Sequence, residues 1–434
     1  MKTSMLRYTL GLGLFVVAVI SPDLAFGQAA KEHMLRLDSL ASEMLENNPQ
    51  LRGARKQAES SWKKVGQAIS WDAPQIGVEF FQTPTSSFPN PAKNSMETDY
   101  FIQQMFPFPG KLSAAGSSAE NNARMVDQGY KALERKVISD LKAAYHELYL
   151  VQRKIQINAE NQDLMKQFVQ IASKQYEVGT GQHHEILRAQ VELSTLMNDG
   201  VILQKEKKAS EAMLNTLLSR PTDSPLGYVP DPDVSLPPLT FQQLRQLALD
   251  SRPEIHAMGY AIEMNQSELQ LSKREYYPDL MVKLAYKNMR TQTNDFWSAM
   301  VGVNVPLALW SKGKYSSKIE ENELNVRRAE EEFNGMKNMT LFEVQDALVK
   351  VQTNQNLLLL YKNTVIPQAR QTLEATIIAY QTGRSMFLWL IDIYRTLLNA
   401  QLSYHQAVMD FMKSQAELER AVGLSMSDIR ERIR

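Results

Sequence analysis

Two short stretches decide the architecture of this chain: YEVGTG at residues 176–181 and YQTGRS at residues 380–385. Each has a tyrosine followed three residues later by a glycine, and the two stretches lie 204 residues apart. Three further pairs keep that spacing to within one residue: Pro49 and Pro253, Pro74 and Pro278, and Gly110 and Gly313. A constant offset over so long a stretch is the signature of internal duplication. The chain is therefore one structural unit written twice.

A very long helix precedes the turn in each unit. Apolar residues between Val126 and Ile155 recur every three or four positions, which is the helical period. From Gly110 to Tyr176 the first unit offers 66 residues, which span roughly 100 Å as a helix. A compact domain does not need such a helix. Neighbouring helices must therefore cover its apolar stripe, as in a coiled coil or a tube.

The other elements follow the same order in both units. Shorter helices are expected at Pro49–Trp71 and Pro253–Tyr276, and return helices after the turns at Glu185–Leu218 and Leu388–Val422. Residues 221–238 between the units hold six of the eighteen prolines, which is typical of a linker. The expected division is a signal peptide at 1–27, a first unit at 28–220, a linker at 221–239, a second unit at 240–423 and a charged tail at 424–434.

Each unit also has two strand candidates with alternating polarity. In the first, Ile76, Val78 and Phe80 share one face, and Gln75, Gly77 and Glu79 share the other. The remaining candidates are Thr98–Phe106, Asp279–Asn288 and Trp297–Leu307. Segments of this length with apolar-out, polar-in alternation are typical of transmembrane β-strands, with polar external loops at Pro84–Glu97 and Asn288–Asp295. The alternative is an amphipathic hairpin packed on a soluble core.

Four strands per chain cannot close a barrel, and lipid does not tolerate open sheet edges. Several chains must therefore share one barrel. Two chains would give eight strands and a barrel filled by its own side chains, whereas three would give twelve strands and room for an aqueous lumen. The fold class is thus mixed, mainly α with a small β part.

The first residues predict export. Lys2 and Arg7 precede the apolar run Leu10–Ile20, which is too short to span a bilayer but suits the core of a signal peptide. Small residues at Ala25 and Gly27 predict cleavage before Gln28, with cleavage after residue 29 as the alternative. No cysteine is present, so no lipid anchor on cysteine is expected.

Composition excludes several kinds of chemistry. Lys plus Arg and Asp plus Glu number 48 each, so the net charge is zero and general binding of nucleic acid is not expected. The missing cysteines remove thiolate metal sites and disulfides. Gly110-Lys111 and Gly313-Lys314 lack the upstream glycine of a phosphate loop, and no nucleophile or zinc-protease motif is present. We expect no enzyme, no cofactor and no metal site.

Some residues have both a functional and a structural interpretation. His183 and His184 are adjacent, so on a helix they diverge by about 100° and cannot chelate one metal unaided. The 21 methionines could handle soft metals, but most occupy apolar helical positions, which is typical of packing. Tryptophans near the helix–strand junctions can mark a membrane interface or simply pack: Trp62, Trp71, Trp297 and Trp310.

This order of elements resembles the TolC-like outer-membrane efflux proteins over essentially the whole mature chain. The two turn motifs carry the resemblance, and Met105-Phe106-Pro107-Phe108-Pro109-Gly110-Lys111 is similar to the branch that serves heavy-metal efflux. The resemblance implies a homotrimer with a twelve-stranded barrel in the outer membrane, anchored in lipid, and a long α-helical tunnel through the periplasm. It also implies a passive exit duct that a periplasmic adaptor joins to an inner-membrane pump of the resistance-nodulation-division type.

The resemblance also assigns roles at the turns. Adaptor docking is expected at Val178, Gly179, Thr180, Thr382, Gly383 and Arg384. A periplasmic gate is expected at Glu185, Arg188, Tyr380, Trp389 and Asp392. Asp392 matches a position where relatives carry a pore-lining carboxylate, whereas Trp389 stands at the other such position. Arg188 and Asp392 are equivalent in the two units, so they could pair between neighbouring repeats; the alternative is a solvated pair of Asp392 with Arg395.

One other class of protein fits part of the pattern: an exported coiled-coil scaffold without a pore. The four alternating strands and the duplication favour the duct, because a scaffold needs neither. The residues do not name the exported compound, which could be a metal ion or an organic molecule.

Overall fold

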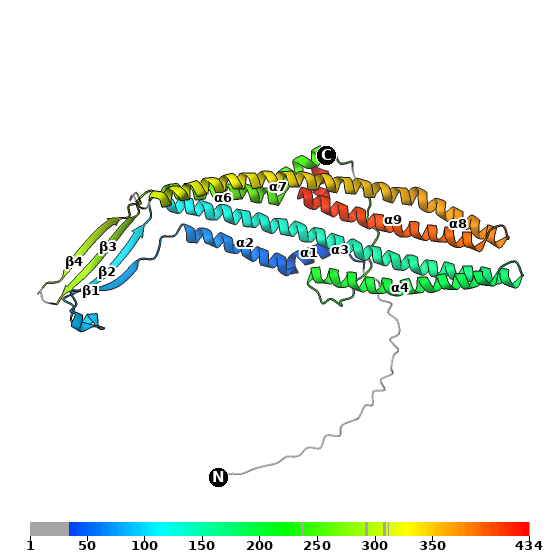
Figure 1. Cartoon of the computed structure of the whole chain (residues 1–434), viewed down its shortest axis with the longest axis horizontal. Helices are drawn as coiled ribbons and strands as arrows, with labels where there is room; N and C mark the ends of the chain where they lie inside the picture. Colours follow the sequence, from blue (N-terminus) through cyan, green and yellow to red (C-terminus); the bar gives the residue numbers. More distant parts are fainter. Residues whose placement is uncertain (1–33, 236–237, 291–293, 307–309, 311, 434) are drawn as a thin grey trace, which may run out of the picture.

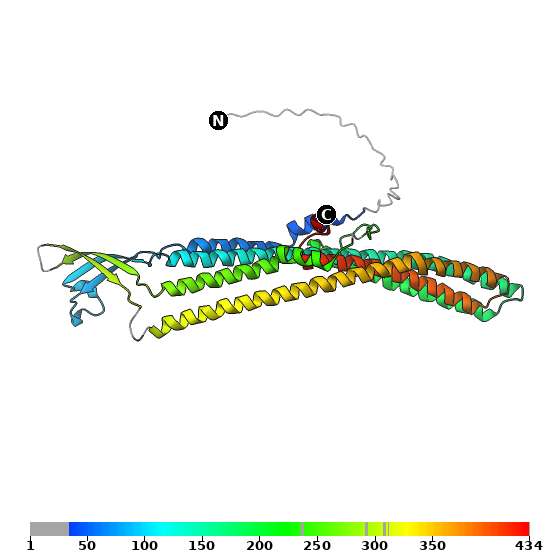
Figure 2. The ribbon, with the colours of Figure 1, turned by 90° about the horizontal axis from the view of Figure 1, so that it is seen from above.

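The computed structural model describes residues 34–433, apart from 236–237, 291–293, 307–309 and 311. The expected signal peptide lies outside these residues. The described chain is long and narrow, with a small sheet at one end and two helical turns at the other (Figure 1, Figure 2). The mixed, mainly helical fold expected from the sequence is confirmed.

The first unit forms one long antiparallel helical hairpin. Helix α3 (Lys111–Glu177) has 67 residues, which correspond to about 100 Å, and α4 (His183–Leu218) returns along it. Gly110, with φ of +92°, stands immediately before α3. The long helix and the return helix both lie where the sequence predicts them.

The second hairpin lies beside the first but is interrupted once (Figure 1). Helix α7 (Lys312–Leu360) passes through a π-helical turn, η3 (Tyr361–Val365), into α8 (Ile366–Gln381), and α9 (Phe387–Val422) returns. Pro367 lies two residues after the end of the π-helical turn. Because proline lacks an N–H and its ring crowds the carbonyl one turn earlier, regular α-helical bonding cannot continue there.

The spacing between equivalent buried residues changes across this π-helical turn. Before it, the fully buried Leu148 and Val351 lie 203 residues apart. After it, the buried Met165 and Ala369 lie 204 residues apart. The second long helix therefore holds one residue more than the first, and η3 is where that residue is accommodated.

Shorter helices lead into the sheet from both units. Helix α2 (Pro49–Ala68) and helix α6 (Pro253–Arg274) each begin at the proline that the sequence predicts. Both end before Trp71 and Tyr276, where the sequence analysis placed their ends. These two helices end earlier than predicted because the chain must become extended before Pro74 and Pro278 in order to enter the strands.

Helices α1 (Leu37–Asn47) and α5 (Phe241–Ser251) were not predicted from the sequence. Each lies directly before one of the proline-started helices. Asn48 separates α1 from α2, and its Oδ1 accepts a hydrogen bond of 2.9 Å from the Gln50 N–H. Its Nδ2 donates to the Leu217 carbonyl at 3.1 Å, which ties this corner to the return helix.

The sheet has four antiparallel strands in the order β1-β2-β3-β4. They are β1 (Gln75–Phe81), β2 (Glu97–Phe106), β3 (Leu280–Met289) and β4 (Phe296–Val303). The pairing of β2 with β3 joins the two units in one sheet. The predicted strand 297–307 is too long at its end: β4 stops at Val303, and Pro306 further on cannot donate to a ladder. Two short 3₁₀ turns, Thr85–Ser87 and Pro91–Lys93, lie between β1 and β2.

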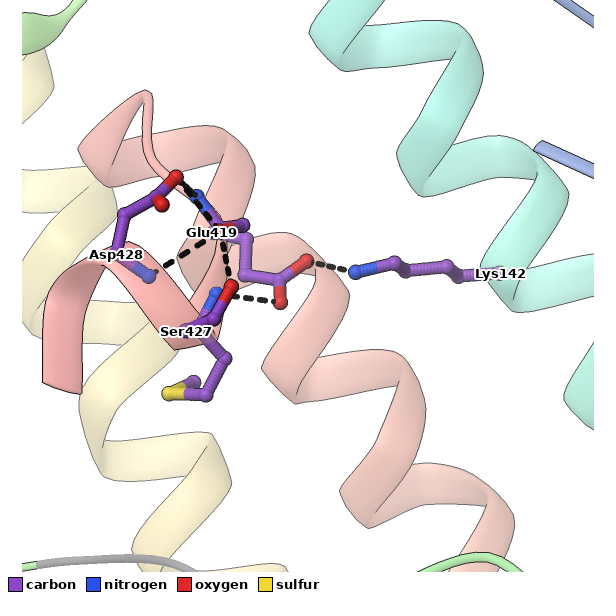
Figure 3. A network of polar contacts seen from close by, with 6 residues as sticks. Lys142, Glu419, Ser427 and Asp428 are labelled. Atoms are coloured by element: carbon purple, nitrogen blue, oxygen red, sulfur yellow. Dashed lines mark hydrogen bonds and ion pairs between the residues drawn. The ribbon is translucent and has the colours of Figure 1, made fainter. Parts of the chain in front are cut away.

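The middle of the molecule is thickened by the linker and the C-terminus (Figure 2). The charged tail contains a helix, α10 (Met426–Ile433), whose Ile429 is fully buried. Glu419 of α9 links α10 to α3, since its Oε1 accepts from the Met426 N–H at 2.8 Å and its Oε2 contacts Lys142 (Figure 3). The end of the chain is therefore clamped to both units.

The proline-rich linker is held against α3 by side chains. Gln152 donates from Nε2 to the Gly227 carbonyl at 3.0 Å and accepts from the Val229 N–H at 2.9 Å. The Tyr149 hydroxyl lies 3.0 Å from a carboxylate oxygen of Asp231. The linker is thus extended, as its prolines predict, and is fixed to the first hairpin.

His146 of α3 gives this region a dependence on pH. Its side chain is 3% exposed, and burial lowers the pKa of the imidazole to about 4, with nearby Lys142 acting in the same direction. The unfolded chain binds a proton near pH 6.5, whereas the folded chain does so only near pH 4. Stability is therefore fully present above pH 6.5 and falls as the pH decreases towards 4, by about 3 kcal/mol.

We expect His146→Leu to flatten the fall in thermal midpoint between pH 7.5 and pH 4.5, measured by circular dichroism on the detergent-solubilised protein. His184→Leu, at an exposed position, serves as the control and should keep the slope of the unchanged protein. An unchanged slope in the His146 variant would contradict this assignment.

Candidate functional site

The two faces of the sheet differ sharply in character. One face is apolar and exposed; its residues are Ile76, Val78, Phe80, Tyr100, Ile102, Leu280, Leu284, Tyr286, Trp297, Val301 and Val303. An exposed apolar surface this large marks contact with lipid or with another protein. The alternation predicted from the sequence is least regular on β2, where Gln104 lies on the apolar face and Phe101 on the opposite one.

The opposite face is lined with charges. Lys283 pairs with Glu79 at 2.8 Å, and Lys287 pairs with Glu97 at 2.5 Å and with Asp99 at 3.1 Å. The five groups are three carboxylates and two ammonium groups, so this face carries one net negative charge per chain. Such a face suits water rather than lipid.

The described chain has two open edges along its length. In the sheet, β1 and β4 each pair on one side only. Among the helices near the sheet, α2 contacts α3, α3 contacts α6 and α6 contacts α7, so α2 and α7 lie at the two sides. The open edges of the sheet and of the helical layer therefore continue into one another.

Helix α4 carries an exposed apolar row near the turns. Leu187, Val191 and Val201 are exposed, and Val191 is 66% exposed. The first two belong to a shallow groove of about 650 Å³, which is lined by Leu187, Gln190, Val191, Ser194, Thr195 and Asn198. On the other hairpin, Phe342 and Ile378 are similarly exposed. Apolar rows of this kind on long helices are covered by partner helices.

The two turns have the same geometry. Gly179 has φ of +77° and Gly383 has φ of +71°. In the first turn the Thr180 N–H donates to the Gln175 carbonyl at 2.9 Å, and in the second the Arg384 N–H donates to the Ala379 carbonyl at 2.8 Å. These six-residue bonds are those of a helix-ending motif that requires a left-handed residue, which explains the glycines.

The expected docking residues lie at the exposed tips of these turns. Val178 is 71% exposed, and Thr180 and Arg384 are also exposed. The Thr382 hydroxyl donates to the Ile378 carbonyl at 3.0 Å, so this residue caps its own helix. The tips present one apolar and several polar groups to the outside.

Three polar contacts tie the two hairpins together near the turns. The Gln175 Nε2 donates to the Gln381 carbonyl at 2.9 Å. The Tyr380 hydroxyl donates to Glu185 Oε2 at 3.0 Å, and the same carboxylate oxygen accepts from the Gln182 N–H.

The third contact is a two-pronged ion pair between α4 and α9. The Arg395 guanidinium reaches both carboxylate oxygens of Glu192, at 3.0 Å and 2.5 Å. This hydrogen bonding raises the pKa of Arg395, and burial followed by contact with Glu185 raises the pKa of Tyr380. Both donors therefore stay protonated at any physiological pH.

The remaining gate candidates are placed differently. Arg188 and Asp392 are exposed, and within the described residues neither forms an ion pair. The solvated pair of Asp392 with Arg395 is not formed, because Arg395 is directed to Glu192. Trp389 is exposed at the start of α9.

Glu185 and Tyr380 were expected in the same region, and they do meet. Gln175 and Glu192 were not singled out from the sequence, and Arg395 was given Asp392 as a partner instead of Glu192. Glu192 and Arg395 lie on helices of different units, and comparing equivalent positions of the two units does not say which side chains meet. The contacts depend on how the hairpins pack, which the repeat pattern does not define.

Metal-binding groups are not gathered here. In the described part of the chain, no cluster of three or more His, Cys, Asp or Glu side chains could hold a metal ion. The His183 ring lies 5.5 Å from the Tyr176 ring, at the base of the first turn. None of the described helices combines the length and the apolar character needed to cross a bilayer.

A two-faced sheet on paired hairpins some 100 Å long defines a channel protein whose sheet enters a membrane. The sequence model described as outer membrane efflux protein matches residues 40–220 and 244–424, once for each unit. The chain belongs to that family and is an outer-membrane efflux channel.

Three similar proteins illustrate the match. The cobalt-zinc-cadmium resistance protein CzcC of Cupriavidus metallidurans is 21% identical, over 96% of this chain and 100% of the relative. The outer membrane protein TolC of Vibrio cholerae is 21% identical, over 91% and 92%. A crystal structure of CusC superposes with a TM-score of 0.77 at 17% identity, covering 90% of this chain and 92% of CusC.

A matched pair of glycine-to-alanine substitutions tests whether the positive φ at the turns requires glycine. A Cβ at Gly383 would meet no atom within 4 Å, so Gly383→Ala costs only the left-handed strain, about 1–2 kcal/mol. Gly335 in α7 has equally open space and an ordinary helical conformation. Gly335→Ala should stabilise the protein by about 0.5–1 kcal/mol.

Thermal unfolding of both variants measures the contrast, and the two midpoints should move in opposite directions. A lowered midpoint for Gly335→Ala, or an unchanged one for Gly383→Ala, would contradict the conformational explanation.

Proposed function

We propose that three copies of this chain close into a passive exit duct. The observation that supports this proposal is the pair of open edges, each of which continues from the sheet into the helical layer. Lipid offers no hydrogen-bonding partner to β1 or β4, so each edge needs a strand from another chain. Three chains give twelve strands, which leaves room for a lumen.

Closure explains the two faces of the sheet. The apolar face lies outward in lipid, and the charged face with Glu79, Lys283 and Lys287 lines the lumen. The exposed row on α4 is then covered by the neighbouring chain. The duct has no catalytic role.

We propose that the turns dock a periplasmic adaptor that joins the duct to an inner-membrane pump. Members of the family are components of tripartite systems with such partners. The supporting observation is the projection of two glycine turns of equal geometry from the end opposite the sheet (Figure 1). Val178 is an exposed apolar group there that a protein partner could cover.

The proposed cargo is a metal cation. The support is the match to a cobalt-zinc-cadmium resistance protein over that relative's full length, together with the net negative charge of the polar sheet face. A negative lumen favours cations by its field without a binding cluster. A duct of this kind leaves the choice of cargo largely to the pump.

One pair of variants tests assembly and docking separately. Val191→Glu places a charge in the proposed interface and should yield monomers, measured by light scattering after size exclusion in detergent. Val178→Glu should remain trimeric but lose resistance to cobalt, zinc and cadmium in the native host. A monomeric unchanged protein would overturn closure, and full resistance with Val178→Glu would overturn docking at the turns.

We propose that the ties between the hairpins hold the periplasmic end closed. Glu185–Tyr380 and Glu192–Arg395 join the two hairpins of one chain, and Arg188 could pair with Asp392 between neighbouring chains, since both are exposed and unpaired within the described residues. Exposed ion pairs contribute only about 0–1 kcal/mol each. An adaptor could therefore open such a gate reversibly.

Single-channel conductance in planar bilayers tests the gate. Arg395→Glu should repel Glu192 and raise conductance several-fold, and the added change Glu192→Arg should restore the low value. Asp392→Arg with Arg188→Asp provides the same cycle for the proposed bridge between chains. Conductance that stays at the unchanged level in the single variants would contradict the gate and leave the duct unaffected.

A further inference from the structure

Four methionines project from the charged face of the sheet. Alternation along the strands puts Met105, Met281, Met289 and Met300 on the same side as Lys283. In the strand register Met105 lies directly opposite Met281, and Met300 lies opposite Lys283. Directly opposite residues have Cβ atoms about 5 Å apart, and diagonal neighbours about 7–8 Å. Met105, Met281 and Met300 are therefore gathered at one end of this face; we call them the methionine corner.

Burial in a hydrophobic core does not account for the methionine corner. Met105 is 36% exposed and Met300 is 47% exposed, and none of the three belongs to the buried clusters of the helical part. Methionine is normally buried, where it fills gaps between other apolar side chains. Here three thioethers from three adjacent strands share the face that carries the ion pairs of Lys283 and Lys287.

A neighbouring glycine gives the central methionine its place. Gly302 lies opposite Met281 in the register. A Cβ added at Gly302 would be 2.9 Å from the Met281 methyl carbon, so the methionine occupies the space that the glycine leaves free. The Met281 side chain therefore leans towards β4, the strand that carries Met300.

The nearby ammonium group is directed away from the methionine corner. Lys283 lies between the corner and the rest of the charged face. Its Nζ is 2.8 Å from Glu79 and 4.0 Å from the centre of the Phe101 ring, both on the side away from Met281. The lysine charge is thus paired and turned from the thioethers, so it leaves them accessible to a cation.

We propose that Met105, Met281 and Met300 form a binding site for a soft monovalent cation, copper(I) or silver(I). Thioether sulfur is the ligand class that selects such ions, whereas zinc and cobalt prefer imidazole or carboxylate donors. The site has no charged ligand, so binding is weak and exchange is fast, as a duct requires. It lies on the lumen side of the barrel and in this respect rests on the closure proposed above.

The test uses the full chain in detergent, labelled with ¹³C at the methionine methyl groups, with silver nitrate as the probe. Methyl resonances are assigned by single Met→Leu variants. Silver should shift the three resonances of the methionine corner in a saturable manner. The resonance of Met197, which is 56% exposed on α4, should not move. Zinc chloride should shift none of them.

Substitutions define the site further. Met281→Leu should weaken silver binding at least tenfold, and Gly302→Ala should weaken it several-fold because the added Cβ displaces the Met281 methyl. Met197→Leu is the matched control and should bind as the unchanged protein does. Equal shifts at Met197 and at the corner, or unchanged affinity in Met281→Leu, would overturn the site.

Light scattering on the same samples separates this proposal from the duct. A trimer that does not bind silver would refute the methionine corner and leave the duct intact. A monomer that binds silver through these residues would support the corner and refute closure.

Discussion

Unpaired backbone groups on β1 and β4 are the constraint on which the rest of this structure depends. Lipid cannot hydrogen-bond to them, so the sheet is incomplete as one chain. The same incompleteness continues into the helices, where α4 exposes an apolar row. The internal duplication halves the number of open edges. Because β2 pairs with β3, the two units form one sheet with two open edges, whereas two separate sheets would have four. In the proposed duct, further copies of the chain remove the remaining two.

Much of the fold could be predicted from residue spacing. The offset between the turn motifs, the helical period of α3 and the alternation of the strands are strictly local or periodic signals, and each led to the right element. The short helices α1 and α5 were not predicted: each has only 11 residues and ends just before a proline, so its periodic signal is brief. The end of β4 was overextended because Val305 continues the alternation after hydrogen bonding has stopped.

The site was predicted less well, for a physical reason. The turns could be predicted because a left-handed backbone conformation favours glycine, and the glycines are visible in the sequence itself. The contact of Arg395 with Glu192 follows from how two 36-residue helices are both packed on α3, which no spacing within either helix encodes. Glu185 and Tyr380 were found because both stand close to the turns, where chain reversal limits the possible arrangements. Distance from the turn is therefore what separated the predictable contacts from the others.

The π-helical turn at Tyr361–Val365 preserves the phase of everything beyond it. One additional residue in a regular helix would rotate all later side chains by about 100° around the axis. Tyr380 would then point away from Glu185, and the second turn would no longer match the first. The π-helical turn accommodates the additional residue within one wider turn. The residues after it therefore keep their orientation around the helix axis, and the end of the helix is unchanged. The long helices can thus vary in length between the units while their ends remain matched in orientation.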